Sequence, residues 1–453
     1  MKKTMILSSL AGAAVSFGAV STAAADASAD EVRAIVAEMM ADAQTRSSLL
    51  QSGGMAGYDN GFMISDASGN NTLKINGGTQ FRYTLNFLDD NNNNDDYEGG
   101  FSNPRTQLWF SGNVGDKAIG YEIRGEFSDG TTGGNFNLQN AFLTYSFDNG
   151  VMLKFGQFRS DFARERNVRG FHQLAADRSL TGELFGQTET QGIELSYNAE
   201  DWRFSISFND GLRSRNVDYP AGKGLALAYD PITGNLTGFS NGLGGEADLA
   251  FTGRVEFKFA GAWDQFADFT SMPGSDYAGM VGIAGHYEYT DGDSVAGSDD
   301  LNYFTWTIDA SLEGDGWNVF AAGYGQHFEA DGVVVDNILG TTDDLDADNF
   351  GLIVQGGLFI PETDWELFAR YDAIFADDDL TAGGDGEIYN TLTFGTNWYW
   401  SGHAAKFTFD VQFFIDDAAD FGGVPGFGGD TRVGFLASGD SEVALRAQFQ
   451  LLF

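Results

Sequence analysis

Cysteine is absent from this chain of 453 residues, and histidine and proline are scarce, with 4 and 6 copies. Without a thiol, the chain has no disulfides, no thiol catalysis and no cysteine metal sites. The fold must therefore hold without covalent cross-links. The shortage of proline suits a large β-sheet, because each proline removes one backbone donor from a strand ladder.

Positive charge is also sparse, with 25 Lys and Arg against 65 Asp and Glu and a formal net charge of −40. A polyanion would be repelled, so nucleic acid is excluded as a partner. Strong acidity is typical of disordered chains, but 42% hydrophobic and 14% aromatic residues favour a folded protein.

Long apolar runs are limited to one, which extends from Met5 to about Val20. It follows Lys2 and Lys3 and precedes small residues that end at Ala25. This three-part layout predicts a secretory signal peptide in residues 1–25, cleaved near Ala25. The remaining chain then has no stretch suited to a membrane-spanning helix.

Residues 26–50 have the spacing of an amphipathic helix, and a glycine-rich linker in residues 51–61 follows. The apolar positions recur every three or four residues: Val32, Ile35, Val36, Met39, Met40 and Ala43. We predict a short N-terminal α-helix, which either packs on itself or the rim of the next domain, or forms a coiled coil between protomers.

From Leu73 onward the apolar period changes from 3.6 to 2. Phe251, Val255 and Phe257, for example, alternate with Arg254 and Glu256. About sixteen such segments can be counted, joined alternately by short turns and long loops. We therefore predict an all-β fold for residues 62–453: a transmembrane antiparallel β-barrel of about 16 strands, preceded by the short α-helix.

Tryptophans lie beside the short turns, as an aromatic girdle at one membrane interface requires. They are Trp202, Trp317, Trp365, Trp398 and Trp400. The short turns are predicted to be periplasmic, with one longer connection at 261–276. The predicted external loops are 88–103, 159–186, 211–245, 329–348 and 416–440.

The last strand alternates strictly from Glu442 to the terminal aromatic residue. Phe449, Leu451 and Phe453 on its apolar face resemble the C-terminal signal that the barrel-assembly machinery reads in outer-membrane proteins. This strand places the chain in outer-membrane lipid of a Gram-negative bacterium. Its other face, with Glu442, Arg446, Gln448 and Gln450, is predicted to be wetted lumen wall.

The third long loop concentrates arginine, unlike the other long loops. Its arginines are Arg159, Arg164, Arg166, Arg169 and Arg178, and we predict that they form a pore constriction. Permanently charged guanidinium groups favour anions in a narrow pore.

Basic residues on the predicted inner face extend the positive charge along the first half of the barrel. They are Lys74, Arg82, Arg105, Arg124, Lys154, Arg203, Arg254 and Lys258. Because Glu122, Glu126, Glu194 and Glu256 share these walls, the alternative is a lattice of cross-strand ion pairs that stiffens the barrel. Selectivity and the lattice are compatible.

The acidic outer loops are interpreted as solvated surface, with loose binding of divalent cations as the alternative. Asp344, Asp346 and Asp348 have the spacing of a calcium loop, but Asn349 and Gln355 occupy its glycine and glutamate positions. An EF-hand is therefore rejected. No metal site, cofactor or catalytic residue is predicted, because no nucleophile motif surrounds the histidines.

Two short stretches resemble the phosphate-selective porin O and P family. One comprises Gly156, Gln157, Phe158, Arg159, Phe162, Glu165, Asp177, Arg178 and Ser179, and the other Gly69, Asn70, Leu73, Lys74, Gly77, Gln80 and Tyr83. The resemblance implies a homotrimeric porin of sixteen strands whose third loop folds inward.

The leading functional hypothesis is passive diffusion of small hydrophilic solutes or ions, with a preference for phosphate-like anions. The alternative is a structural or cation-binding surface barrel with a plugged lumen. An outer-membrane hydrolase ranks last, because the four histidines are scattered along the chain.

Overall fold

The computed structural model describes residues 54–88, 97–127, 136–211, 214–216, 225–229, 236–241, 247–291, 300–336, 341–381, 386–421, 424, 427–437 and 441–453. The predicted signal peptide, the predicted helix at 26–50 and residues 51–53 lie outside this part of the chain. None of the helices in the described part has the length and apolar character needed to cross a membrane.

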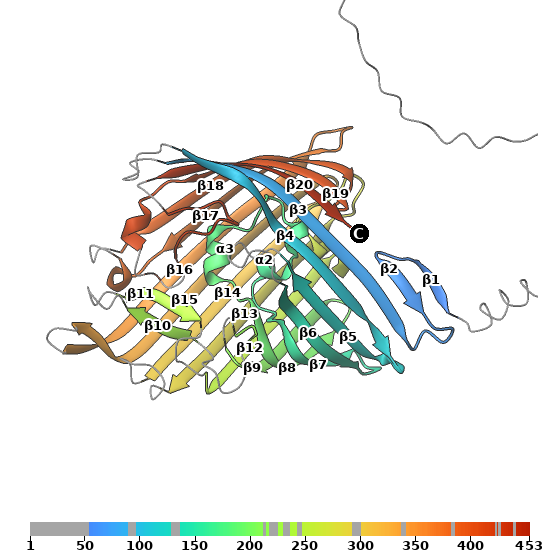
Figure 1. Ribbon diagram of the computed structural model, residues 1–453, viewed down its shortest axis with the longest axis horizontal. Helices are drawn as coiled ribbons and strands as arrows, with labels where there is room; N and C mark the ends of the chain where they lie inside the picture. The colour runs from blue at the N-terminus through green and yellow to red at the C-terminus, as the bar shows by residue number, and fades with distance from the viewer. Residues whose placement is uncertain are drawn as a thin grey trace, which may run out of the picture. The chain divides into compact units, whose positions relative to one another are not determined.

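The described residues form a closed antiparallel barrel of 16 strands in chain order (Figure 1). They are β3 (Thr72–Leu88), β4 (Tyr97–Val114), β5 (Asp116–Glu126), β6 (Asn137–Ser146), β7 (Val151–Arg159), β8 (Glu189–Asn198), β9 (Trp202–Asn209), β12 (Leu249–Ala260), β13 (Ala278–Asp291), β14 (Asp300–Gly314), β15 (Trp317–Asp336), β16 (Thr341–Phe359), β17 (Trp365–Phe375), β18 (Ile388–Ser401), β19 (Ala405–Phe414) and β20 (Glu442–Leu452). The predicted all-β barrel and its strand number are confirmed, whereas the predicted N-terminal helix stays a prediction.

The last strand closes the ring by pairing with the first. The β20–β3 register extends from Glu442 opposite Leu88 to Leu452 opposite Gly78. Beyond the strand, Phe453 exchanges backbone hydrogen bonds with Gly77. The terminal alternating segment is therefore the seam of the barrel.

Two hairpins supplement the barrel. β1 (Met55–Tyr58) and β2 (Phe62–Ser65) pair with each other, and β2 also pairs with the start of β3. Residues 55–58, predicted as linker, thus form a strand. Within the connection from β9 to β12, β10 (Leu225–Tyr229) pairs with β11 (Leu236–Asn241).

The alternation along the strands sorts side chains as predicted on the outer face. On β12, Phe257 is 50% exposed while Arg254 is 2% exposed. This is the reverse of a water-soluble protein, and it suits a barrel surrounded by hydrocarbon. The stacked pair Trp365 and Trp398, with ring centroids 5.3 Å apart, lies beside a short turn as the girdle requires.

One predicted external loop is largely strand. Residues 329–348 are predicted to be an external loop, yet β15 continues to Asp336 and β16 begins at Thr341. Likewise, β4 already begins at Tyr97. Ladder hydrogen bonds come from the backbone, so acidic side chains do not prevent strands from extending beyond the membrane.

The connection between β7 and β8 folds into the barrel. This third loop, residues 160–188, contains α2 (Arg164–Asn167), η1 (Gly170–His172) and α3 (Leu180–Phe185), and Figure 1 shows α2 and α3 within the ring of strands. The long connection after β12 contains η2 (Trp263–Ala267), and shorter turns η4 (Asp378–Leu380) and η5 (Ala418–Phe421) follow β17 and β19.

An apolar core lies inside the barrel, where the third loop meets the wall from β15 to β20. Phe162 and Phe185 of the loop belong to the same buried cluster as Phe320 and Tyr324 of β15. α3 approaches β16 so closely that a Cβ on Gly351 would lie 2.7 Å from the ring of Phe185. We call the wall from β15 to β20 the filled side.

The prediction of a wetted inner face on β20 is wrong. Arg446, Gln448 and Gln450 are at most 2% exposed, and Glu442 is 3% exposed. Gln450 donates to the carbonyl oxygen of Phe171 at 2.9 Å, so the third loop covers this wall. The polar face of the strand serves loop packing on the filled side.

Candidate pore constriction

The buried carboxylate of Glu165 joins two segments of the third loop. It accepts hydrogen bonds from the backbone N–H and the hydroxyl of Ser179, at 2.9 and 2.8 Å. Ser179 in turn caps α3 by accepting from the N–H of Gly182. Burial raises the pKa of Glu165, while the nearby Arg370 and the Ser179 donors oppose that shift. The loop therefore has its own internal support.

Asp177 joins the loop to β3 and β4. Its carboxylate forms ion pairs with Arg105 at 2.5 Å and Arg82 at 3.0 Å, and all three side chains are nearly inaccessible to solvent. Burial by itself would raise the pKa of Asp177, but Arg105 and Arg82 hold it well below its usual range. Two of the predicted lumen bases are thus bound to the loop and cannot face a solute.

Polar side chains of β18 and β19 bind the backbone of the loop. Lys406 donates to the carbonyl oxygen of Gln173, and Asn397 donates to that of Leu174, both at 2.9 Å. Asp410 accepts from the N–H of Ala176 at 2.9 Å. These groups satisfy backbone atoms that would otherwise be buried without partners.

Four of the five loop arginines are engaged within the protein. Arg159 pairs with Glu189 at 2.7 Å and Arg166 with Glu183 at 2.6 Å. Arg164 donates to the hydroxyl of Ser311 at 2.6 Å and to the carbonyl of Phe266 at 2.9 Å. Arg178 donates to the carbonyls of Glu165 at 3.1 Å and Val168 at 2.9 Å. Arg164 and Arg178, both at most 4% exposed, therefore hold loop segments together.

Arg169 differs from the other four. No hydrogen bond or ion pair joins its guanidinium to another side chain in the described part of the chain, and the group lies 5.3 Å from the ring centroid of Trp109. Burial lowers its pKa; Glu122 opposes the shift and Arg159 adds to it. Both side chains are thus close enough to act on it electrostatically.

Arg169, Arg124 and Arg159 form a cluster, which we call the arginine trio. Arg124 lies 5.6 Å from the ring of Trp109 and pairs with Glu122 at 2.7 Å. Among the described residues, the Nε atoms of Arg124 and Arg159 are buried donors without hydrogen-bond partners. The trio therefore has hydrogen-bonding capacity that the protein leaves unused.

The other predicted wall bases form ion pairs, as the lattice alternative expects. The pairs are Lys74–Asp59 at 3.3 Å, Lys154–Glu194 at 2.6 Å, Arg203–Glu256 at 3.4 Å, Arg254–Asp309 at 2.8 Å and Lys258–Asp201 at 3.7 Å. Ion pairing is thus common to these bases, but the acids Asp59 and Asp201 lie outside the strands, so only the other three pairs join strands.

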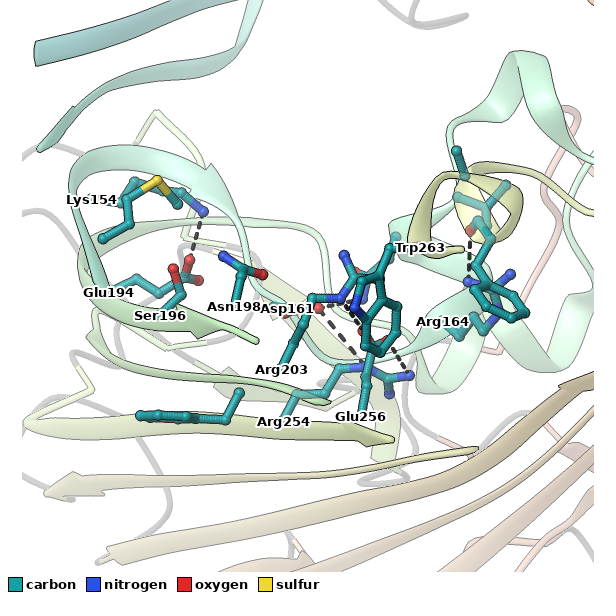
Figure 2. A pocket seen from close by; sticks show the side chains of 16 residues that line it. Lys154, Asp161, Arg164, Glu194, Ser196, Asn198, Arg203, Arg254, Glu256 and Trp263 are labelled. Carbon is teal, nitrogen blue, oxygen red and sulfur yellow. Dashed lines mark hydrogen bonds and ion pairs between the residues drawn. The ribbon is translucent and has the colours of Figure 1, made fainter. Parts of the chain in front are cut away.

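A cavity of about 340 Å³ lies beside the start of the third loop (Figure 2). β7, β8, β9, β12 and η2 contribute its lining, in which Arg203 lies 3.7 Å over the ring centroid of Trp263. We call the wall from β5 to β9, together with this cavity, the cavity side.

The sequence analysis missed the inward role of Trp109 and Trp263. The unusual length of the connection after β12 indicated a special segment, but no sequence pattern placed Trp263 inside the barrel. For metal binding, the described residues contain no group of three or more His, Asp or Glu side chains that could hold an ion.

A closed barrel with an apolar outer face and an inward-folded loop defines a porin-type barrel of the outer membrane. The comparisons agree with that class. Residues 74–240 match the family model of phosphate-selective porin O and P, which confirms the predicted resemblance. None of the curated proteins matches the chain.

Solved structures share the fold at low sequence identity. An anion-selective porin from Comamonas acidovorans is 12% identical with a TM-score of 0.53, over 84% of this chain and 99% of that one. The outer-membrane channel DcaP of Acinetobacter baumannii is 15% identical, and OmpF of Salmonella typhi, in complex with daunomycin, is 13% identical; each has a TM-score of 0.51 over 88% of this chain and 100% of its own. The match to the porin family model and the shared barrel fold support an outer-membrane porin channel.

Proposed function

We propose that this porin lets small hydrophilic anions diffuse passively across the outer membrane, and that the arginine trio sets its ion preference. The observation that carries the proposal is Arg169, which has no acidic partner among the described residues of a chain with 65 acidic side chains. The predicted constriction of five loop arginines is thereby narrowed to Arg169 and Arg159, joined by Arg124 of the wall.

The chemistry of the trio suits oxyanions. A guanidinium group presents planar donors that match the oxygens of carboxylate or phosphate, and it stays charged when partly buried. A passing oxyanion can pair with the guanidinium of Arg169, which forms no ion pair among the described residues. A cation meets the same donors without any compensating contact. The family match supports phosphate as the type of anion.

The position of the trio defines the proposed route. The third loop covers the filled side, so we assign the path of solutes to the cavity side between the loop and the wall from β5 to β9. The filled side also favours the alternative of a plugged structural barrel. Bilayer recordings separate the two hypotheses, because a plugged barrel gives no conductance steps.

The test is the reversal potential of the purified protein in planar bilayers under a potassium chloride gradient. We expect an anion preference that falls severalfold in Arg169→Gln. The matched control is Lys117→Gln, which removes one positive charge from the exposed start of β5 and should leave the reversal potential unchanged. A cation preference in the unaltered protein, or equal effects of the two variants, would contradict the proposed role of the trio.

We further propose that the mature chain begins after Ala25 and assembles as a homotrimer in the outer membrane, as the family resemblance implies. N-terminal sequencing of the protein from outer membranes tests the cleavage position. Sedimentation in detergent tests the oligomer, and a monomer under gentle extraction would contradict it.

A further inference from the structure

The cavity on the cavity side differs in chemistry from the arginine trio. Its volume of about 340 Å³ lies in the range of small-molecule sites. The lining comes from β7, β8, β9 and β12, the start of the third loop and η2, and the strands and the loop supply side chains of both charges (Figure 2). A site of this size and polarity can hold one small hydrophilic solute.

Arg203 forms one end of the cavity. Its guanidinium is stacked 3.7 Å over the ring of Trp263, and its side chain is 32% exposed. Its Nε atom is 3.4 Å from Glu256 but has no hydrogen-bond partner among the described residues. A guanidinium held over an indole and partly exposed is prepared to bind a carboxylate.

Acidic and hydroxyl groups line the rest of the cavity. The carboxylate of Asp161 is 40% exposed and accepts from the hydroxyl of Ser205 at 2.9 Å. Glu194 contacts Lys154 at 2.6 Å. The hydroxyl of Ser196, in a residue only 9% exposed, has no hydrogen-bond partner in the described part of the chain. These oxygens can accept hydrogen bonds from an ammonium group.

The charges of the lining are balanced. Lys154, Arg164, Arg203 and Arg254 are matched by Asp161, Glu194, Glu256 and, directly behind Arg254, Asp309. An ion of either sign that entered this balanced lining would give the cavity a net charge of one. A solute that carries both signs would compensate both.

We infer that this cavity binds a small zwitterion of the α-amino-acid type, with its carboxylate on Arg203 and its ammonium group between Asp161 and Glu194. The hydroxyl of Ser196 supplies a further acceptor beside the ammonium group. This inference rests on the proposed function in one respect: solutes must be able to enter the lumen.

The experiment measures binding directly, so it does not depend on ion selectivity. Equilibrium dialysis of the purified full-length protein in detergent would use labelled L-serine as the probe, with acetate, methylammonium and glycerol as single-feature comparisons. We expect L-serine to bind and each comparison compound to bind at least about tenfold more weakly, the loss of roughly one charge-assisted hydrogen bond. Equal binding of acetate or glycerol would overturn the assignment of a zwitterion.

Two variants locate the site. Arg203→Gln should weaken L-serine binding about tenfold by the same reasoning, and Ser196→Ala should weaken it severalfold. Because the Ser196 hydroxyl has no hydrogen-bond partner among the described residues, its loss leaves the fold intact. The control Lys117→Gln should bind as the unaltered protein does. Unchanged binding in both Arg203→Gln and Ser196→Ala would overturn the inference while leaving the selectivity of the trio untouched.

Discussion

The strands on the two sides of the lumen share the same alternating pattern, but their inward side chains make different contacts. On the filled side, inward side chains pack against the third loop, as the ring of Tyr324 does on Phe185 at 5.6 Å, and against the connection after β12, as Phe320 does on Phe269 at 4.8 Å. On the cavity side, inward side chains line a cavity, and Arg169 lacks an acidic partner among the described residues. The contacts of the loop therefore distinguish a packed wall from a wall that lines a cavity.

The comparison also shows that the number of arginines is a poor guide to their role. Arg82 and Arg105 lie on Asp177, and Arg446 lies on Asp410 at 2.7 Å, so these cations are structural. Arg169 has the same chemistry but forms no ion pair with an acid among the described residues, although Glu122 is close enough to act on it electrostatically.

The largest effect is expected from Asp177→Asn, which leaves Arg82 and Arg105 buried without a counter-charge. Loss of one member of a buried ion pair costs about 3–5 kcal/mol. We expect the third loop to open locally, with faster hydrogen exchange and easier proteolysis of residues 160–188. Asp201→Asn, at a carboxylate 63% exposed, is the matched control. If exchange in the loop stayed slow, Asp177 would not hold the filled side together.

A somewhat smaller effect is expected from Phe162→Ala. The ring is completely buried inside the lumen, and its removal should destabilise the packed loop by about 3 kcal/mol. The control is Phe257→Ala, at an outward ring 50% exposed, which should leave exchange in the loop unchanged. Equal exchange in both variants would mean that the apolar core does not fix the loop.

A moderate effect is expected from acid. Burial and the neighbouring His403 lower the pKa of His172 to about 3, from its ordinary value of 6.5. When the loop opens, the His172 ring becomes exposed and takes up a proton more readily than it does in the packed loop. The packed loop is therefore most stable above pH 6.5, and its stability decreases as the pH falls toward 3. At pH 5 the loss is about 1–2 kcal/mol.

Loop exchange at pH 5 and pH 8 measures this effect of acid. His172→Gln should remove most of the difference between the two pH values. The ion pair of Asp177 works in the same direction only at lower pH, because its carboxylate stays charged until the pH is well below 3.8. A difference that persisted in the variant would assign the acid response to another group.

Sequence reasoning worked where a residue's environment follows from its strand position. The outward Phe257 and inward Arg254 were assigned from alternation, and Phe453 marked the closing strand. It failed for residues whose environment depends on which segment of the chain lies opposite them in the lumen. Phe320 and Tyr324 sit in a stretch of β15 with apolar residues on both faces, so no alternation indicated that they meet the third loop.

The smallest effect is expected from Lys74→Gln at the end of β3. Its ion pair with Asp59 is largely exposed, at 29% and 70%, and exposed pairs contribute less than about 1 kcal/mol. We expect no measurable change in loop exchange or in ion preference, although Lys74 is one of the predicted inner-wall bases. A clear shift in the reversal potential would place an anion-attracting group at this end of the barrel. The selectivity would then be spread along the wall and not confined to the arginine trio.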